Sequence, residues 1–392
     1  MSELRDFLSI KHGWAFKGEY FSDTGDQSIL TPGNFYESGG FKRNFDKARF
    51  YIGDFPAEFV CKKDDLIVAM TEQAAGLLGS TALVPEDNRY LHNQRIGLID
   101  CNEKMYKYFA YYLFMTKTVR EQISRSSSGT KVKHTSPEKI YDVKVTVPKF
   151  QDQEKIANLL MALDQKIALN NQINEELEAM AKTLYDYWFV QFDFPDENGK
   201  PYKSSGGKMV YNDQLKREIP EGWGVKQLGE LDVATGKRDA NFGTENGQYD
   251  FWTTANEPIK ADEYSFEGKA ILIAGNGNFY INFTEGKFEA YQRTYVIQSA
   301  DENELLFMYP ACLQSIEKLR KGSNGSIIKY ITIGDIQNIS QPHCPVVAKM
   351  FVDIFRPIMN TIQKNKQQNQ ELTQLRDWLL PMLMNGQVKV EE

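Results

Sequence analysis

The strongest constraint on the fold is an internal repeat in the 392-residue sequence, with similar short motifs that recur about 195 to 198 residues apart. The tripeptide NQR at residues 93–95, followed by the strand-like residues 96–99, returns as YQR at residues 291–293 followed by residues 294–297. A repeat of half the chain predicts two similar globular domains, because each copy must bury its own apolar faces.

Other elements recur in the same order in both halves. An apolar run predicts a buried strand, a helical pattern follows it, and a polar glycine-containing loop then leads to a basic residue. The apolar runs are residues 65–69 and 270–274, the helical patterns are 106–122 and 304–319, and the loops are 128–130 before Lys133 and 324–326 before Lys329.

Each half ends in a long amphipathic pattern with apolar residues spaced by three and four, which predicts helices over about 152–188 and 346–385. The first helix would span roughly 55 Å, so its apolar stripe needs a partner along its length. We therefore expect the two helices to pair as an antiparallel coiled coil. The predicted stripes are Ile156, Leu159, Leu160, Leu163, Ile167, Ile173, Leu177, Met180, Leu184 and Trp188, and Ile354, Ile358, Ile362, Leu372, Leu375, Leu379 and Leu383.

Polar residues and prolines interrupt these two stripes. A buried asparagine would fix the register of the helix pair, whereas an asparagine facing water would not, and both interpretations stay open for Asn170, Asn174, Asn365 and Asn369. Pro357 is expected to start or kink the second helix, and Pro381 to disturb its end.

Between the halves, glycines and prolines punctuate residues 193–224, which predicts loops and turns rather than core. The predicted fold class is α/β, with two similar domains separated by two long antiparallel helices around a pseudo-two-fold axis. The predicted boundaries are residues 1–150 for the first domain, 151–190 for the central helix, 191–224 for the connector, 225–345 for the second domain and 346–392 for the C-terminal helix.

Composition excludes several classes of protein. The chain lacks the roughly 20 uninterrupted apolar residues of a membrane span, and its charged N-terminus does not resemble an export signal, so a soluble cytoplasmic protein is expected. Four dispersed cysteines and four dispersed histidines indicate neither disulfides nor a structural metal site. With a net charge of −7, contacts to DNA would have to come from local patches.

The sequence also lacks the motifs of several classes of enzyme. The chain has no Pro-Pro pair for the catalytic motif of an amino-methyltransferase, and no P-loop. The best enzymatic alternative is a metal-dependent nuclease, because Glu267-Gly268-Lys269 and the similar sequence at 285–287 match half of a common nuclease pattern. We therefore predict no catalytic residues and no metal ligands.

Polar loops of both halves carry residues that suit DNA recognition. Arginine, asparagine and glutamine can bond base edges, whereas lysine and serine suit phosphates. In the first half the loop at 125–134 is basic, rich in hydroxyls and free of acids, and residues 318–329 are its counterpart. The predicted DNA-binding residues are Gln94, Arg95, Arg125, Ser127, Lys131, Lys133, Asn276, Asn278, Gln292, Arg293, Arg320, Lys321 and Lys329. Solvated turns, or side chains that hold a neighbouring loop, would explain the same residues.

Three stretches of the chain together resemble the specificity subunit of type I restriction-modification systems, over essentially the whole length. The first, PKFQDQEKI at 148–156, continues into LLMALDQKIALNNQINEEL. The second is WFVQFDFPDENGKPYKSSGGKMVYNDQLKREIPEGW, and the third is LRDWLLPMLMNGQV at 375–388. The chain has a single Pro148 where many members of the family have a pair of prolines.

The resemblance implies two target recognition domains that each read one half of a split site in double-stranded DNA, held apart by the paired helices. It also implies that two methyltransferase subunits dock mainly on those helices and that restriction subunits join them. S-adenosylmethionine, ATP and magnesium would then be bound by the partners, and no cofactor by this chain. A stand-alone DNA-binding regulator is the remaining alternative. The helix residues expected to bind partners are Ile167, Leu177, Leu184, Trp188, Ile362, Leu372 and Leu379.

Overall fold

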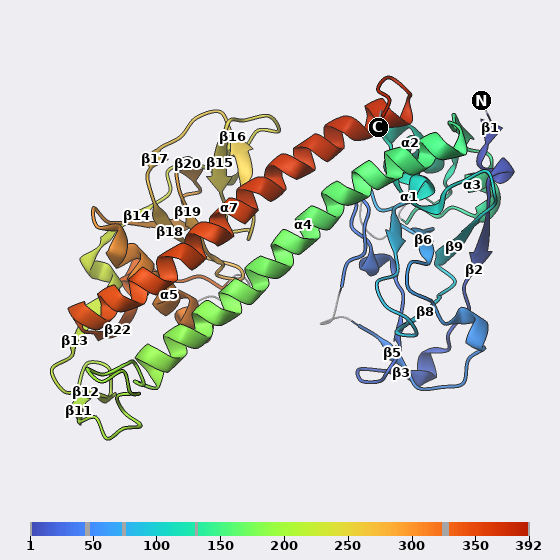
Figure 1. The fold of residues 1–392 in the computed structure, drawn as a ribbon. Helices are drawn as coiled ribbons and strands as arrows, with labels where there is room; N and C mark the ends of the chain where they lie inside the picture. Colours follow the sequence, from blue (N-terminus) through green and yellow to red (C-terminus); the bar gives the residue numbers. More distant parts are fainter. Residues whose placement is uncertain (1, 44–47, 73–75, 130–131, 324–328, 391–392) are drawn as a thin grey trace. The chain divides into compact units, whose positions relative to one another are not determined.

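The computed structural model describes residues 2–43, 48–72, 76–129, 132–323 and 329–390 (Figure 1). The chain forms two compact units. Unit 1 consists of Met1–Leu169 with Gln367–Glu392, and unit 2 is Asn170–Lys366. Each unit therefore combines a globular domain with parts of both long helices.

Unit 1 contains two four-stranded sheets, with strand orders β2-β9-β6-β7 and β3-β5-β4-β8, and a small β1-β10 pair. Strand β6 is buried along its whole length because its sequence, LIVA, is a continuous apolar run. The strands described are β1 (Ser2–Glu3), β2 (Leu8–His12), β3 (Phe21–Ser22), β4 (Ser28–Ile29), β5 (Phe50–Tyr51), β6 (Leu66–Ala69), β7 (Thr81–Leu83), β8 (Tyr90–Leu91), β9 (Ile96–Cys101) and β10 (Lys144–Val145). The short helices are α1 (Lys107–Met115), α2 (Lys117–Ser126) and α3 (Pro137–Tyr141).

Unit 2 repeats this arrangement, with strand orders β14-β21-β18-β19 and β16-β15-β20-β17 and a β13-β22 pair. Strand β18, AILIA, is buried throughout like β6. The strands described are β13 (Gly224–Gln227), β14 (Asp232–Thr235), β15 (Tyr249–Trp252), β16 (Ile259–Ala261), β17 (Phe266–Glu267), β18 (Ala270–Ala274), β19 (Ile281–Thr284), β20 (Lys287–Ala290), β21 (Thr294–Gln298) and β22 (Ser340–His343), with helices α5 (Glu302–Gly322) and α6 (Ile333–Gln337).

Strand pairing confirms the internal repeat. In both units the first sheet is antiparallel, and the second contains one parallel pair, β4 with β8 in unit 1 and β15 with β20 in unit 2. The helical pattern at 106–122 differs from the prediction, because Thr116 separates α1 from α2, whereas α5 continues through Pro310. The loop residues 130–131 and 324–328 lie outside the described residues.

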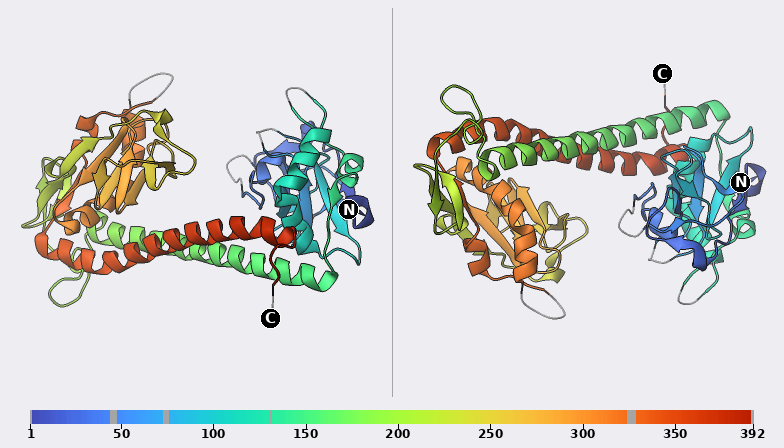
Figure 2. Two further views of the ribbon diagram at one scale, coloured as in Figure 1. Left: turned by 90° about the horizontal axis from the view of Figure 1, so that it is seen from above. Right: turned by 90° about the horizontal axis from the view of Figure 1, so that it is seen from below.

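Two long helices, α4 (Phe150–Tyr185) and α7 (Pro345–Met384), run through both units. In unit 1 the start of α4 lies beside the end of α7, where Arg376 Nη1 donates to Asp164 Oδ1 at 2.8 Å (Figure 2). Asp164 also accepts from Tyr112 Oη of α1 at 2.6 Å, which ties the helices to the domain. In unit 2 the end of α4 lies beside the start of α7. The predicted fold class, two similar α/β domains with long antiparallel helices, is confirmed.

Two of the asparagines are buried in the helix pair. Asn170 and Asn174 are 0% and 6% exposed. The side chain of Asn174 donates to Ile362 O at 3.5 Å and accepts from Asn365 Nδ2 at 2.9 Å. Because a buried amide needs these partners, the pair favours one register of α4 against α7 in unit 2.

The predicted stripes have the wrong phase at three positions. Met180, Ile354 and Leu375 are 61%, 46% and 43% exposed, so they do not lie on the buried face. In α7 that face is formed by neighbours such as Val352, Phe355 and Met359, because spacings of three and four fit more than one phase of a helix.

Two further predictions about the end of the chain and the connector are corrected. Helix α7 begins at Pro345 and contains both Pro357 and Pro381, so Pro357 does not start it. The connector contains a hairpin, β11 (Met209–Asn212) and β12 (Arg217–Pro220), and contributes to the core of unit 2. Apolar burial outweighs its glycines and prolines, since Phe192, Phe194 and Ile219 are at most 5% exposed.

Replacing Asn365 by alanine should lower the free energy of unfolding by about 1–2 kcal/mol, because the buried Asn174 Oδ1 loses its donor. Asn360→Ala, at an exposed position of the same helix, is the matched control and should change little. Urea unfolding of the full chain measures both variants. Equal stability of the two variants would contradict a structural role for the asparagine pair.

Candidate nucleic-acid interface

In unit 1 a ladder of backbone hydrogen bonds gathers three segments at the end of β6. Met70 N donates to Arg95 O at 3.1 Å, and Thr135 N donates to Met70 O at 2.9 Å. Glu72 N donates to Lys133 O at 2.9 Å. The end of β6, the turn before β9 and the segment before α3 therefore form one loop cluster, which we call cluster 1 (residues 70–72, 92–96 and 132–135).

The turn that presents Gln94 and Arg95 is closed by a buried histidine. His92 is 2% exposed, and its Nε2 lies 2.8 Å from Ile96 O. A carbonyl can only accept, so Nε2 carries the proton. Gln94 N donates to Trp14 O at 3.2 Å, and both Gln94 and Arg95 are exposed. The backbone is thus fixed on both sides while the two side chains face water.

Unit 2 has the same ladder. Gly275 N donates to Arg293 O at 2.7 Å, Ile331 N to Gly275 O at 3.0 Å, and Gly277 N to Lys329 O at 3.3 Å. These residues form cluster 2 (residues 275–280, 290–294 and 329–331). The bond from Gln292 N to Arg238 O, 2.9 Å long, matches that from Gln94 to Trp14.

The two ladders match residues of the two domains one by one. Gln94 corresponds to Gln292, Arg95 to Arg293 and Lys133 to Lys329. Single antiparallel bridges match a further pair of positions, Thr71 with His134 in cluster 1 and Asn276 with Tyr330 in cluster 2. Predicted DNA-binding residues from distant segments are thus brought together twice, and their contacts with DNA remain a prediction.

Among the described residues, the other predicted DNA-binding residues lie at the ends of α2 and α5. Arg125, at the end of α2, pairs with Glu121 at 2.9 Å, and Ser127 Oγ donates to Ser124 O at 2.6 Å. Lys321 is exposed at the end of α5. Lys131 lies outside the described residues.

Arg320 supports cluster 2 from α5. Its Nη2 donates to Asn278 O at 3.2 Å, and its Nη1 pairs with Glu317 at 2.7 Å. Asn278 Nδ2 donates to Tyr280 Oη at 3.1 Å. Arg320 and Asn278 therefore help to hold the loop, which was the alternative explanation for such residues.

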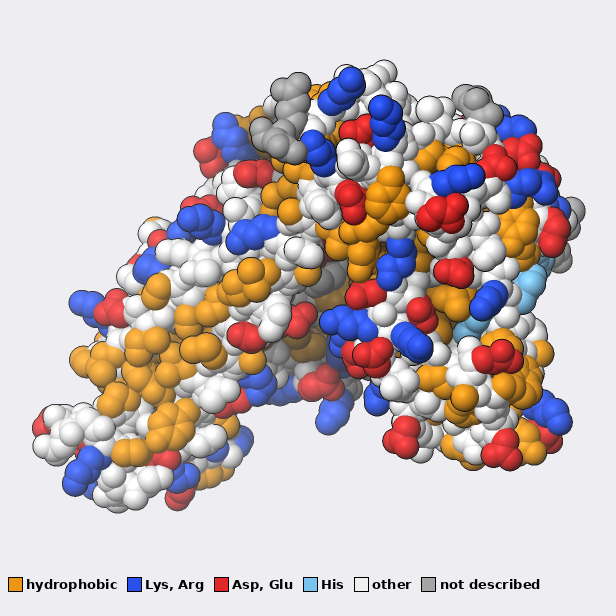
Figure 3. All heavy atoms as spheres, turned by 45° about the vertical axis from the view of Figure 1, so that its right-hand side comes forward, with side chains coloured by type: hydrophobic (Ala, Val, Ile, Leu, Met, Phe, Trp, Pro, Cys, Tyr) orange, Lys and Arg blue, Asp and Glu red, His pale blue; other side chains and the backbone are white. Residues whose placement is uncertain are grey.

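Basic and acidic side chains are interspersed on the face that Figure 3 shows. Lys133 Nζ lies 4.0 Å from Glu72 Oε2, so part of its charge is balanced locally. Among the described residues, by contrast, no acidic group forms a salt bridge with Arg95, Arg293 or Lys329. Arg95 and Arg293 thus offer positive charge to phosphate at matched positions of the two clusters.

Reasoning from sequence missed His92, Arg238 and Tyr330. Tyr330 could have been found as the residue 196 positions after His134, at the offset that separates Lys133 from Lys329. His92 and Arg238 carried no such signal, since the matched residues are Ala290 and Trp14.

The helix residues predicted to bind partners are mostly covered by the chain itself. Trp188 and Ile362 are 5% and 2% exposed in the core of unit 2. The others are partly buried, namely Ile167, Leu177, Leu184, Leu372 and Leu379. Apolar side chains do gather on the surface over the start of α7 and the end of α4 (Figure 3, lower left), where Val346, Met350 and Ile354 are exposed.

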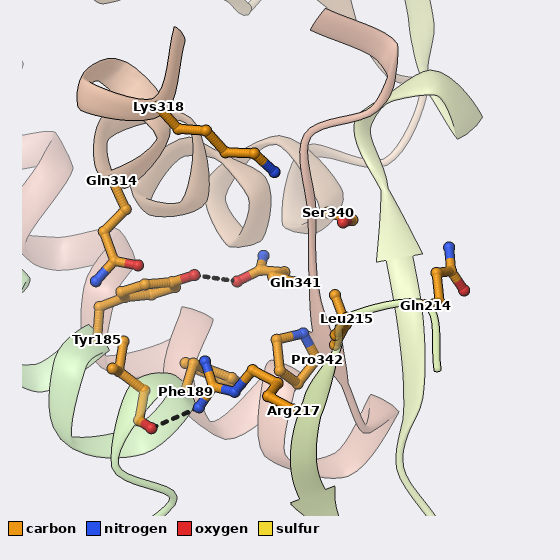
Figure 4. Close-up of a pocket in the computed structure, with 11 residues that line it drawn as sticks. Tyr185, Phe189, Gln214, Leu215, Arg217, Gln314, Lys318, Ser340, Gln341 and Pro342 are labelled. Carbon is orange, nitrogen blue, oxygen red and sulfur yellow. Dashed lines mark hydrogen bonds between the residues drawn. The ribbon is translucent and has the colours of Figure 1, made fainter. Parts of the chain in front are cut away.

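A cavity of about 200 Å³ lies within unit 2, between the end of α4, α5, β22 and the connector (Figure 4). Tyr185 Oη donates to Gln341 Oε1 at 2.7 Å in its wall, and Arg217 Nη2 donates to Val190 O at 2.6 Å. None of the predicted DNA-binding residues lines this cavity. It is lined by Tyr185, Phe189, Val190, Gln214, Leu215, Arg217, Gln314, Lys318, Ser340, Gln341 and Pro342.

The two Glu-Gly-Lys segments of the nuclease alternative lie side by side. Gly268 N donates to Gly286 O at 2.9 Å and accepts in return at 3.1 Å. Lys269 pairs with Glu302 at 2.7 Å and approaches Glu285 at 3.7 Å. In the described part of the chain, His, Cys, Asp and Glu residues form no group of three or more that could hold a metal ion. No helix among the described residues is long and apolar enough to span a membrane.

Comparisons with known proteins agree on one family. The family model described as type I restriction modification DNA specificity domain matches residues 1–179 and 220–374. The chain is 30% identical over 312 residues to the specificity subunit of the type I restriction enzyme MjaIX from Methanocaldococcus jannaschii, covering 72% of this chain and 69% of that protein. It is 35% identical over 180 residues to the EcoDI specificity subunit from Escherichia coli, covering 44% and 40% respectively.

A solved structure shows the same fold. The S subunit of a type I restriction-modification system from M. genitalium matches with a TM-score of 0.61 at 15% identity, over 97% of this chain and 95% of that one.

Acidification should weaken unit 1 through His92. Burial lowers the pKa of His92, against the hydrogen bond to Ile96, so the folded chain keeps this imidazole neutral. Below about pH 6.5 the unfolded chain binds a proton that the folded chain does not, and the free energy of unfolding should fall by at most about 1.4 kcal/mol per pH unit. Urea unfolding at pH 7.5, 6.5 and 5.5 measures this loss.

His92→Gln keeps an N–H donor without a titrating group and should reduce the slope between pH 6.5 and 5.5. The matched control is His134→Gln, which changes an exposed histidine of the same domain that does not contribute to the lowered pKa of His92, and it should keep the slope of the wild type. An unchanged slope in His92→Gln would contradict the role given to His92.

Proposed function

Because the chain belongs to the family of type I restriction modification DNA specificity proteins, we propose that it recognises a bipartite DNA sequence and has no catalytic role of its own. The observation that carries the proposal is the ladder of backbone hydrogen bonds that occurs in both domains and displays a Gln-Arg pair each time. Two similar readers with different side chains suit two different half-sites.

The chemistry of the clusters suits both kinds of DNA contact. Gln94 and Arg95 have side chains that bond base edges in the major groove, and so do Gln292 and Arg293. Lysines such as Lys133 and Lys329 suit phosphates, which position a protein on the duplex without reading sequence. Each domain thus combines base-reading groups with phosphate-binding groups on a fixed backbone.

We propose that the long helices set the spacing between the half-sites. A helix of 36 residues, such as α4, is about 54 Å long, which equals about 16 base pairs. The Asn174–Asn365 contact in unit 2 and the Asp164–Arg376 contact in unit 1 hold the helices in register. A spacer whose register is fixed gives a spacing that is fixed as well.

We also propose that two methyltransferase subunits dock on these helices, with restriction subunits joining the complex. S-adenosylmethionine, ATP and magnesium would be bound by those partners. The exposed side chains of Met180 and Leu375 support the docking, because they are 195 residues apart and each lies in a different unit. A repeated apolar contact suits two copies of one partner. The exposed stripe on α7 is not repeated, since polar Gln151 and Lys155 stand 195 residues before Val346 and Met350.

Lengthening both helices should lengthen the spacer of the recognised site. Four residues inserted after Leu169 in α4 and four after Lys366 in α7 add about 6 Å, or about two base pairs. Methylome sequencing of cells that express the chain with its methyltransferase partner should then show unchanged half-sites around a longer spacer. The control is a four-residue insertion after Ser205, in an exposed turn of the connector. Altered half-sites, or the original spacer, would contradict the spacing role.

Met180→Asp should remove one of two bound methyltransferase subunits, Leu375→Asp the other, and the double variant both, because a carboxylate cannot be buried cheaply in an apolar interface. Native mass spectrometry of the assembled complex counts the subunits. Ala168→Asp adds the same charge at another exposed position of α4 and should leave two subunits bound. Two subunits on the double variant would place docking elsewhere.

The alternatives predict different results for the chain alone. A stand-alone regulator would bind its site tightly without partners at physiological salt, whereas the proposed subunit needs its methyltransferase for strong binding. A nuclease would cleave DNA with magnesium alone and lose that activity in Glu267→Ala or Glu285→Ala.

A further inference from the structure

We propose that Asn276 reads an adenine in the half-site of the second domain, and that the matched Thr71 of the first domain does not read a base. The inference rests on the proposed function and adds to it the chemistry of one base contact. It follows from the place of these two residues in the backbone ladders of clusters 1 and 2.

Thr71 and Asn276 occupy the same position. Thr71 pairs with His134 and Asn276 with Tyr330, each in a single antiparallel bridge just after the buried central strand. The side chains of directly opposed residues lie on the same face of such a pair. Tyr330 is exposed and Asn276 is partly exposed, so the side chain of Asn276 lies at a solvent-facing surface, whereas Thr71 is only 6% exposed.

The backbone around Asn276 is shaped for close approach. At Gly275 a Cβ atom would lie 2.6 Å from Arg293 O, so only glycine fits there. Gly277 has a φ of +72° and no neighbour within 4 Å of a Cβ position, which leaves open space beside Asn276. Gly275 thus lets the backbone of Arg293 approach, and the open space at Gly277 allows a ligand to reach the side chain of Asn276.

The loop is also held in place before any DNA arrives. Phe279 is fully buried, and Arg320 donates to Asn278 O. Tyr295 Oη donates to Ile331 O at 2.9 Å, which fixes the segment opposite the loop. A side chain on such a loop loses little freedom when it binds, so its hydrogen bonds can discriminate between bases.

The two side chains offer different chemistry. An asparagine side chain can accept a hydrogen bond from adenine N6 through Oδ1 and donate one to adenine N7 through Nδ2 in the major groove. Thr71 Oγ1 lies 3.2 Å from His134 Nδ1, so its hydroxyl is already engaged by the imidazole. Asn276 therefore presents its amide to a base, whereas Thr71 is held within its own domain.

The test uses the full chain assembled with its methyltransferase partner, with methylome sequencing and methylation rates on duplexes that vary one base at a time. Exchange of residues 1–148 for those of a relative with another specificity first assigns each half-site to its domain. Asn276→Thr should then lower the rate on the original site about ten- to hundredfold and abolish the adenine requirement at one position of the second half-site. Thr71→Val, at the matched buried position, should leave the bases required in the first half-site unchanged.

Two further variants separate reading from folding. Asn276→Gln keeps an amide that can bond adenine and should retain the preference for it. Asn360→Thr makes the same exchange as Asn276→Thr on the exposed face of α7 and should behave as the wild type.

The outcomes distinguish this inference from the function on which it rests. A wild-type complex without a bipartite methylated motif would overturn the proposed function. A bipartite motif that Asn276→Thr leaves unchanged, or a rate that falls equally for every base at every position, would overturn the role of Asn276 and leave the proposed function standing.

Discussion

The pairing of α4 with α7 is the interaction on which the rest of the structure depends. A helix of 36 or 40 residues with one apolar face is not stable alone in water, so each needs the other along its length. The fold of unit 1 includes the C-terminal part of α7, because Arg376 bonds to Asp164 and Leu383 is buried in the core of unit 1. The final helix thus finishes a domain that the first 169 residues begin.

The two domains that these helices carry have the same backbone fold and differ in their side chains. The ladder bonds are the same, but the residues at equivalent positions differ. Met70 of unit 1 corresponds to Gly275 of unit 2, Thr71 corresponds to Asn276, and His92 corresponds to Ala290. Backbone bonds do not depend on side chains, so they tolerate such exchanges as long as the loop is still held. Recognition can therefore diverge between the halves while the architecture stays constant.

Much of this architecture could be predicted from sequence, because repeats, buried strands and long helices leave strong periodic signals. Runs such as LIVA at 66–69 are apolar on both faces, and the Gln-Arg pairs stand at a constant distance from the strands that follow them. Helical phase could not be predicted, as Met180 and Leu375 show, since spacings of three and four fit neighbouring phases. The connector was misjudged because its aromatic residues Phe192 and Phe194 join the same core as Phe351 of the distant α7, a tertiary effect that local composition does not reveal.

The loop clusters show why the site itself was only partly predictable. The turn that carries the Gln-Arg pair is held by an aromatic contact in unit 1 and by an ion pair in unit 2. Trp14 of unit 1 packs edge-on against Phe59, with 5.5 Å between ring centroids, whereas the matched Arg238 pairs with the fully buried Glu289 at 3.3 Å. Glu289 can be buried because Ser265 and the amide of Ala290 also donate to it. An aromatic contact and an ion pair share no sequence pattern, so only the backbone reveals that they hold the same turn. The side chains that hold the turn can thus differ between the domains while the backbone ladder is kept, which suits the proposed reading of two unlike half-sites.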